Sequence, residues 1–175
     1  MRSRRYLTAP GVVLLAGALV SAAPKPAAPA LVCERLADVR LPNTTITAAQ
    51  PVTGGSFTPA GSTNAITNLP LFCRVAGVIE PTKDSHILFE VWLPLEKWNG
   101  KFAGVGNGGW AGTISFGALA GQIRRGYATA STNTGHQAMP GEDMARFAFE
   151  HPEQLIDFAY RSATEIFRGF DTAST

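Results

Sequence analysis

The segment from residue 98 to residue 131 constrains the fold of this chain more than any other. It predicts a strand at 101–105, a glycine-rich loop at 106–112, a helix at 115–125 and a buried strand at 127–131. This order and spacing make a βαβ unit, which implies parallel pairing and a right-handed crossover. The loop leaves backbone N–H groups open to an anion, because glycine has no Cβ to block the approach. The expected fold class is therefore α/β.

The composition of the chain indicates a folded domain. Of its 175 residues, 45% are hydrophobic and only 16% are charged, which argues against disorder. The formal net charge of +2 is misleading, because three of the 15 basic residues lie before residue 23 and leave 12 basic against 13 acidic residues in the remainder. This balance gives no reason to expect nucleic acid or an anionic membrane surface as a partner.

Residues 1–23 have the pattern of a signal peptide. A basic start at 2–5 precedes a short apolar run at 11–20 and small residues at the expected cleavage site. The alternative is a membrane anchor, but the apolar run has about half of the ~20 residues that a bilayer span needs. A Pro/Ala linker follows at 24–30. The expected location is secreted or periplasmic, with no membrane attachment after cleavage.

Export bears on the two cysteines of the chain, Cys33 and Cys73. An oxidising compartment favours a bridge between them. Closing a loop of roughly 40 residues is worth about 4 kcal/mol on the chain-entropy model. A metal site is the alternative, and it is disfavoured because two isolated cysteines lack the ligand spacing and nearby histidines that such a site needs.

Short patterns predict the strands outside the βαβ unit. Residues 31–70, rich in Thr, Gly, Asn and Pro, predict irregular strands and turns. Strands are expected at 72–80 and 84–94. In the second, apolar side chains at positions 87, 89, 91 and 93 alternate with those at 86, 88, 90 and 92. The face that begins with His86 is expected to meet solvent.

The C-terminal segment predicts a helix. Pro152 occupies a favoured first position, Glu153 suits the helix N-terminus, His151 is expected to cap it and Gly169 to end it. The acidic residues of this region lack metal-ligand spacing and are interpreted as surface and helix-start charges: Glu142, Asp143, Glu150, Glu153 and Asp157.

Several groups of residues, taken in order, resemble the tannase and feruloyl esterase family. Each motif alone is weak, but their order and spacing are specific, and the match extends from about Cys33 to Arg161. The groups are 71–75, 89–94 with 98–102, 106–112, 125–129 with 134–136, and 151–153 with 157–161.

The resemblance implies a secreted carboxylic ester hydrolase with the α/β-hydrolase fold, a mixed, mostly parallel sheet with flanking helices. Such enzymes act on small esters of aromatic acids through a Ser-Asp-His triad, with the serine in a Cys-Ser-x-Gly-Gly elbow; a lid that often holds calcium lies downstream. The sequence has no such elbow. Residues 31–175 are therefore expected to be an incomplete N-terminal portion, truncated before the nucleophile, without a cofactor and inactive alone. Asn133 stands where the family usually has Asp, and the sequence after Ser162 departs from the usual helix.

The resemblance also assigns roles in the glycine loop. The backbone N–H of Gly109 becomes an oxyanion-hole donor, with Gly108 shaping the turn; one such donor is worth about 3 kcal/mol of barrier. The alternative is a glycine turn that needs a positive φ. Trp110 lines the acyl pocket or, equally, packs in the core.

Other residue types that could carry chemistry are interpreted as structural. Ser115, Ser131 and Ser162 lack the glycine-flanked elbow that exposes a nucleophile. His136 is expected to bond neighbouring backbone, because the family's catalytic histidine lies beyond residue 175. The alternative function is a small secreted, disulfide-bonded binding module without catalysis. The sequence leaves the aromatic acid, the alcohol and the oligomeric state open.

Overall fold

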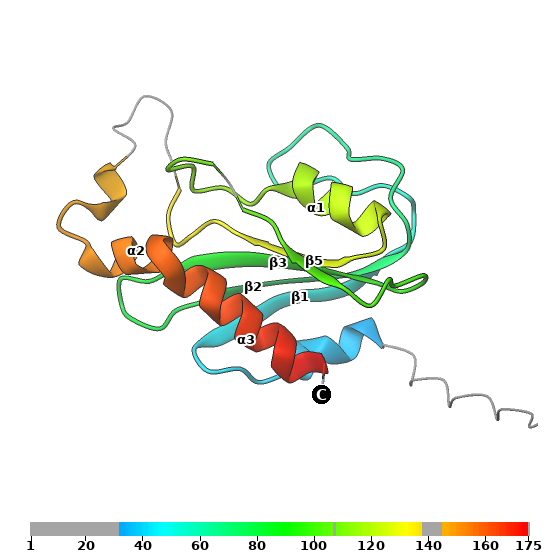
Figure 1. Ribbon diagram of the computed structural model, residues 1–175, viewed down its shortest axis with the longest axis horizontal. Coiled ribbons are helices and arrows are strands. Elements are labelled where there is room, and N and C mark those ends of the chain that lie inside the picture. Colours follow the sequence, from blue (N-terminus) through cyan, green and yellow to red (C-terminus); the bar gives the residue numbers. More distant parts are fainter. Residues whose placement is uncertain (1–31, 107, 138–144, 175) are drawn as a thin grey trace, which may run out of the picture. The chain divides into compact units, whose positions relative to one another are not determined.

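A five-stranded sheet in the order β1-β2-β3-β5-β4 forms the centre of the computed structural model (Figure 1). The structure describes residues 32–106, 108–137 and 145–174. The predicted signal peptide and linker lie outside these residues, as do Glu142 and Asp143. The strands are β1 Thr44–Val52, β2 Phe72–Ile79, β3 Ile87–Pro94, β4 Phe102–Gly104 and β5 Ala128–Thr132. Over the described ranges, no helix has the length and apolar character needed to cross a membrane.

The sheet is mixed, as predicted, but its pairings are mainly antiparallel. β1–β2, β2–β3 and β3–β5 pair antiparallel, and β4–β5 pairs parallel from Phe102↔Ala128 to Gly104↔Ala130. Helix α1 (Phe116–Arg124) connects the parallel pair, so the predicted βαβ unit is confirmed. The mixed sheet with flanking helices agrees with the expected fold class; among the described strands only β4–β5 pairs parallel, because a parallel pair needs a long crossover and α1 provides it there.

Helices cover both faces of the sheet (Figure 1). On one face, Ile87 and Phe89 of β3 pack in a core that includes Ile166 of helix α3 (Ser162–Ser174). On the other face, the fully buried Trp92 packs with Leu119 and other residues of α1.

The prediction that one side of β3 faces solvent is therefore wrong. Glu90 and Trp92 are 3% and 0% exposed, because α1 covers the face that periodicity assigned to water. His86, which was placed on the same face, precedes β3 and is exposed, where its Nδ1 lies 2.9 Å from Glu80 Oε1. Alternation located the strand correctly but could not show that a helix lies above it.

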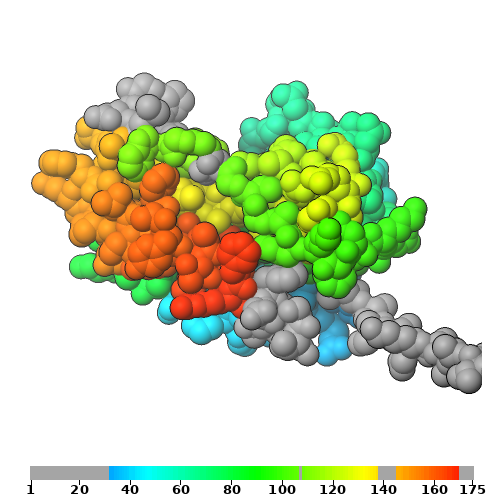
Figure 2. Space-filling model, in the orientation of Figure 1, coloured from blue at the N-terminus to red at the C-terminus, as the bar shows by residue number. Residues whose placement is uncertain are grey.

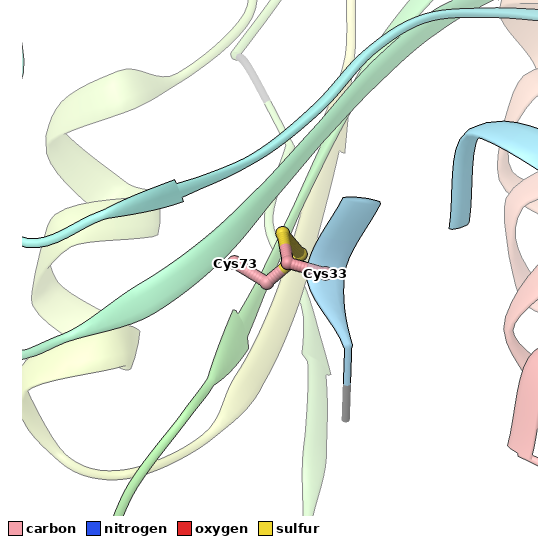
Figure 3. Close-up of a disulfide and its surroundings, with 2 residues drawn as sticks. All are labelled: Cys33 and Cys73. Carbon is pink, nitrogen blue, oxygen red and sulfur yellow. A yellow bond between two sulfur atoms is a disulfide. The ribbon is translucent and has the colours of Figure 1, made fainter. Parts of the chain in front are cut away.

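The predicted Cys33–Cys73 disulfide is present and joins the short 3₁₀ helix η1 (Cys33–Asp38) to β2 (Figure 3). Both cysteines are buried. The region 31–70 is more regular than predicted, because β1 is a nine-residue strand paired with β2 across a register shift between Ile46 and Ala48. No position of this strand is buried and few of its residues are strongly apolar, so its sequence carried little hydrophobic periodicity.

The C-terminal helix begins at Pro152 as predicted but is interrupted and longer than expected. Helix α2 (Pro152–Ile156) passes into a π-helical turn, η3 (Asp157–Arg161), and then into α3. Gly169 does not end it. A Cβ at Gly169 would lie 3.2 Å from Leu41 Cδ1, a close contact that the leucine side chain would have to relieve by a small shift.

Candidate functional site

Two loops lie together where the parallel strands β4 and β5 end. The glycine loop, of which the structure describes residues 106 and 108–112, follows β4, and the 133–137 turn follows β5. Val105 N–H donates to Ala130 O (2.8 Å) and continues the pairing up to the loop. In α/β sheets, ligands bind outside the carboxyl ends of the strands. This is therefore the end of the sheet where a site is expected.

Gly109 combines a left-handed backbone with open surroundings. Its φ is +57°, a conformation that residues with a Cβ rarely adopt. A Cβ at Gly108 or Gly109 would meet no atom of the described residues within 4 Å, so conformation and not space requires glycine at 109. The Gly109 N–H donates to no acceptor among the residues that the structure describes. Such an exposed, unused amide can bind an anion.

The glycine loop is tied to the sheet by two serines. Ser115 Oγ donates to Gly106 O (2.9 Å), and Ser115 N–H donates to Ser131 Oγ (3.0 Å). Ser162 is 2% exposed within α3. No serine in the described part of the chain hydrogen-bonds to a histidine.

Trp110 is packed on one side of its ring and exposed on the other. Its ring stacks on Phe158 of η3, with centroids 4.8 Å apart, and lies 5.8 Å from Phe147 of the 3₁₀ helix η2 (Arg146–Ala148). It remains 36% exposed. In Figure 2 the light-green loop lies at the surface against the orange segment that carries these two phenylalanines. Trp110 therefore packs on one side and is open on the other.

His136 links the two loops. Its Nε2 lies 2.7 Å from the backbone carbonyl oxygen of Trp110, and because a carbonyl only accepts, Nε2 is the donor. The ring is 6% exposed and stacks on Phe147 with centroids 3.7 Å apart. A histidine bonded to backbone was predicted, but its partner lies in the other loop, which sequence alone could not indicate.

The decisive comparison is with protein families. The family model described as "Tannase and feruloyl esterase" matches residues 73–169, more than half of the chain. The chain belongs to the tannase and feruloyl esterase family.

Relatives and solved structures agree with this membership. An uncharacterized esterase of Xanthomonas campestris pv. campestris is 44% identical over 154 residues, which cover 87% of this chain and 26% of that protein. A probable feruloyl esterase B-2 of Aspergillus fumigatus is 34% identical over 131 residues, covering 71% of this chain and 24% of that protein. The crystal structure of feruloyl esterase B from Aspergillus oryzae has a TM-score of 0.66 at 30% identity, covering 77% of this chain and 27% of the solved one. The chain thus spans about a quarter of the length of the curated relatives it matches.

Asn133 builds the turn after β5. Its Oδ1 accepts from the N–H groups of Leu88 (2.8 Å) and Gly135 (3.0 Å). A carboxylate oxygen can accept the same two bonds, so an aspartate at this position would keep the acceptor. Thr134, the next residue, has a φ of +57°, which is strained for a β-branched side chain.

The family's helix segment contributes a buried ion pair that the sequence interpretation missed. Asp157 was expected at the surface, yet its side chain is fully buried, 2.6 Å from Arg161 Nη1. Arg161 also donates to Glu153 Oε2 (2.8 Å) and to Ser85 Oγ (3.2 Å). Burial lowers the pKa of Arg161, but hydrogen bonds to Glu153 and Asp157 outweigh it, so the pKa lies above its ordinary value. The signal in the sequence was the i, i+4 spacing of Asp157 and Arg161.

The predicted capping role of His151 is corrected. His151 occupies the N-cap position of α2, but its side chain makes no capping hydrogen bond, and its carbonyl accepts from Gln154 and Leu155 instead.

A second buried ion pair, Arg74 with Glu90, was not predicted; Glu90 also accepts from Trp92 Nε1 (3.2 Å). Burial raises the pKa of Glu90 although hydrogen bonding and charge from Arg74 act to lower it. In the described part of the chain, no three metal-ligating side chains form a group that could hold an ion.

Proposed function

We propose that the chain provides an oxyanion half-site to a carboxylic ester hydrolase of the tannase and feruloyl esterase type. In the reaction, a serine attacks the ester carbonyl and its oxygen becomes negative in a tetrahedral intermediate. The Gly109 N–H donates to that oxygen, which is worth about 3 kcal/mol of barrier. The nucleophile and the other triad members come from outside these residues. The observation that carries the proposal is an unused amide held at a φ of +57° at the carboxyl end of a parallel strand.

The substrate class we propose is a small ester of an aromatic acid. The open side of Trp110, 36% exposed beside the Gly109 amide, offers a ring on which an aromatic acyl group stacks. Relatives named feruloyl esterase support this class. We further propose that the protein is secreted or periplasmic, which the disulfide supports.

The test uses a hybrid esterase, in which residues 32–174 replace the structurally equivalent quarter of Aspergillus oryzae feruloyl esterase B. Hydrolysis of methyl ferulate is measured for the hybrid esterase and for Gly109→Ala. Alanine costs about 1–2 kcal/mol in the left-handed conformation, so the turn rotates the N–H away and kcat falls roughly tenfold. KM changes little, because the lost interaction forms in the transition state.

Gly61→Ala is the matched control. Gly61 also has a positive φ, +76°, and open space for a Cβ, but it lies outside the glycine loop, so kcat stays close to that of the parent. Equal losses in both variants, in folded proteins with unchanged near-UV dichroism, would exclude Gly109 as the donor. The alternative function, a binding module, predicts saturable binding of ferulate to the chain and no effect of Gly109 on hydrolysis.

A further inference from the structure

The Gly109 N–H belongs to a relay of two hydrogen-bonded peptide planes. Ala111 N–H donates to Gly108 O (3.3 Å), which closes a turn with Gly109 and Trp110 at its centre. Gly108 C=O and Gly109 N–H are parts of one planar peptide group, so holding that carbonyl also fixes the direction of the N–H. Trp110 C=O and Ala111 N–H form the second plane in the same way.

His136 holds the far end of this relay. Its Nε2–H donates to Trp110 O at 2.7 Å, so the Trp110–Ala111 plane is bonded at both its carbonyl and its N–H. The imidazole is itself fixed, 6% exposed and stacked 3.7 Å from Phe147. Its other nitrogen, Nδ1, lies 3.3 Å from Thr134 Oγ1.

Two glycines next to the relay, Gly112 and Gly135, are closely packed. A Cβ at Gly112 would overlap the carbonyl oxygen of His136, and a Cβ at Gly135 would lie 2.8 Å from Asp157 Cβ. Thr134, which directly precedes Gly135, is held at a φ of +57°, a strained value that persists only where surrounding structure imposes it. Close glycine contacts and a strained turn are thus both used to place His136.

We propose that His136 is a positioning residue, whose hydrogen bond to Trp110 O orients the Gly109 N–H through the two peptide planes. This inference rests on the proposed function, because it explains how the oxyanion donor is held before substrate arrives. A preorganised donor needs no reorientation when the negative charge develops. His136 itself touches no reacting atom in this assignment and takes no proton.

Three substitutions separate the hydrogen bond from the shape of the ring. Gln places an amide nitrogen the same number of bonds from Cα as histidine Nε2, so His136→Gln keeps a donor for Trp110 O. His136→Asn places its nitrogen where Nδ1 was and loses that bond. His136→Phe keeps a flat ring on Phe147 but has no donor.

The first readout is the Gly109 amide itself, in the full chain labelled with ¹⁵N-glycine. We expect the Gly109 resonance of His136→Gln to match that of the unmodified chain. In His136→Phe and His136→Asn it shifts or broadens, because the relay has lost its anchor and the Gly109 peptide plane samples more than one direction. Resonances of Gly117 and Gly121 in α1 stay unchanged in all variants and report that the sheet and helix remain folded.

The second readout is kinetic and uses the hybrid esterase. We expect kcat to fall about tenfold or more in His136→Phe and His136→Asn, with KM within about threefold, and to recover in His136→Gln. A purely structural histidine would instead lower the melting temperature of the Phe and Asn variants with kcat intact below melting.

The outcomes distinguish the inference from the function on which it rests. If the Gly109 amide, or kcat in the hybrid esterase, responds equally to Gln and Phe, the hydrogen bond does not position the loop and the inference is overturned. If the amide responds as expected while kcat is the same in all variants, His136 orients the loop but Gly109 is not the oxyanion donor. In that case the proposed function is wrong, while the positioning role of His136 stands.

Discussion

The middle of the sheet and the loops at its carboxyl end are held in different ways. In the middle, β2 and β3 are buried on both faces, with Trp92 stacked 4.4 Å from Phe72 on one side and the disulfide on the other. In the loops, single side chains hold the backbone: Asn133 binds two N–H groups and His136 binds one carbonyl. The first region resists unfolding through buried area, whereas the second fixes the direction of individual peptide groups. Substitutions in the two regions should therefore separate stability from activity.

The largest effect that sharpens this comparison is expected from Trp92→Ala. Trp92 is fully buried, and removing it costs about 3–5 kcal/mol of unfolding free energy, measured by urea denaturation. Trp98→Ala is the matched control, since Trp98 is 55% exposed and should cost far less. Comparable losses for the two tryptophans would mean that the α1 face does not carry the stability assigned to it.

Arg74→Ala leaves the buried carboxylate of Glu90 without its partner and should cost about 3–5 kcal/mol. The sign of the pH dependence follows from the raised pKa of Glu90. A carboxyl whose pKa is higher in the folded state stabilises the fold below the pKa of the unfolded chain, and that contribution is lost as pH rises through the folded pKa. The cost of Arg74→Ala should therefore grow as pH rises through that range.

Glu90→Gln removes this titration. Its unfolding free energy, compared with that of the parent across the same pH series, should improve in relative terms as pH rises. A difference that is independent of pH would contradict the direction assigned to the Glu90 pKa.

Replacing both cysteines by serine tests how far the disulfide acts. It closes a separation of 40 residues, so the chain-entropy model gives a loss of up to about 4 kcal/mol. Because the disulfide joins η1 to β2 and not to the loops, we expect a lower melting temperature with an unchanged Gly109 amide resonance. A changed resonance would show that the two regions are coupled.

The smallest effect on stability comes from the glycines. Gly112→Ala forces a Cβ against the His136 carbonyl and should cost about 1–3 kcal/mol while moving the glycine loop. Gly117→Ala, exposed in α1 with open space around its Cβ, should instead stabilise the chain by about 0.5–1 kcal/mol. If Gly112→Ala left the Gly109 resonance in place, the close contact would have no part in positioning the loop.

The sequence predicted those features that have a period or a motif. Alternation found β3, helical spacing found α1, and the motif order pointed to the family that the comparisons show. It did not predict that α1 covers Trp92, because periodicity records one strand at a time and not what is packed on it. Nor did it find η3, since one extra residue in a helical turn leaves no pattern in the apolar spacing.

The same distinction, between features with a sequence motif and features without one, applies to the candidate site. Gly108, Gly109 and Trp110 were nominated through the family motif, and their catalytic and substrate roles stay predictions. The bond from His136 to Trp110 O joins residues 26 positions apart through one side chain and one carbonyl, which no local pattern encodes. Asp157 was placed at the surface because charge was weighed without knowledge that Gly135 closes over it.

The strand order has a consequence for synthesis on the ribosome. β5 lies between β3 and β4 although it follows both along the chain. β1, β2 and β3 can pair as soon as they leave the exit tunnel, within microseconds, as hairpins do. β4 emerges next, but its described neighbour is complete only after Thr132. At about 5–20 residues per second, translating the intervening stretch takes seconds. Throughout that interval β4 and one edge of β3 wait unpaired, a window in which a chaperone can reach the nascent chain.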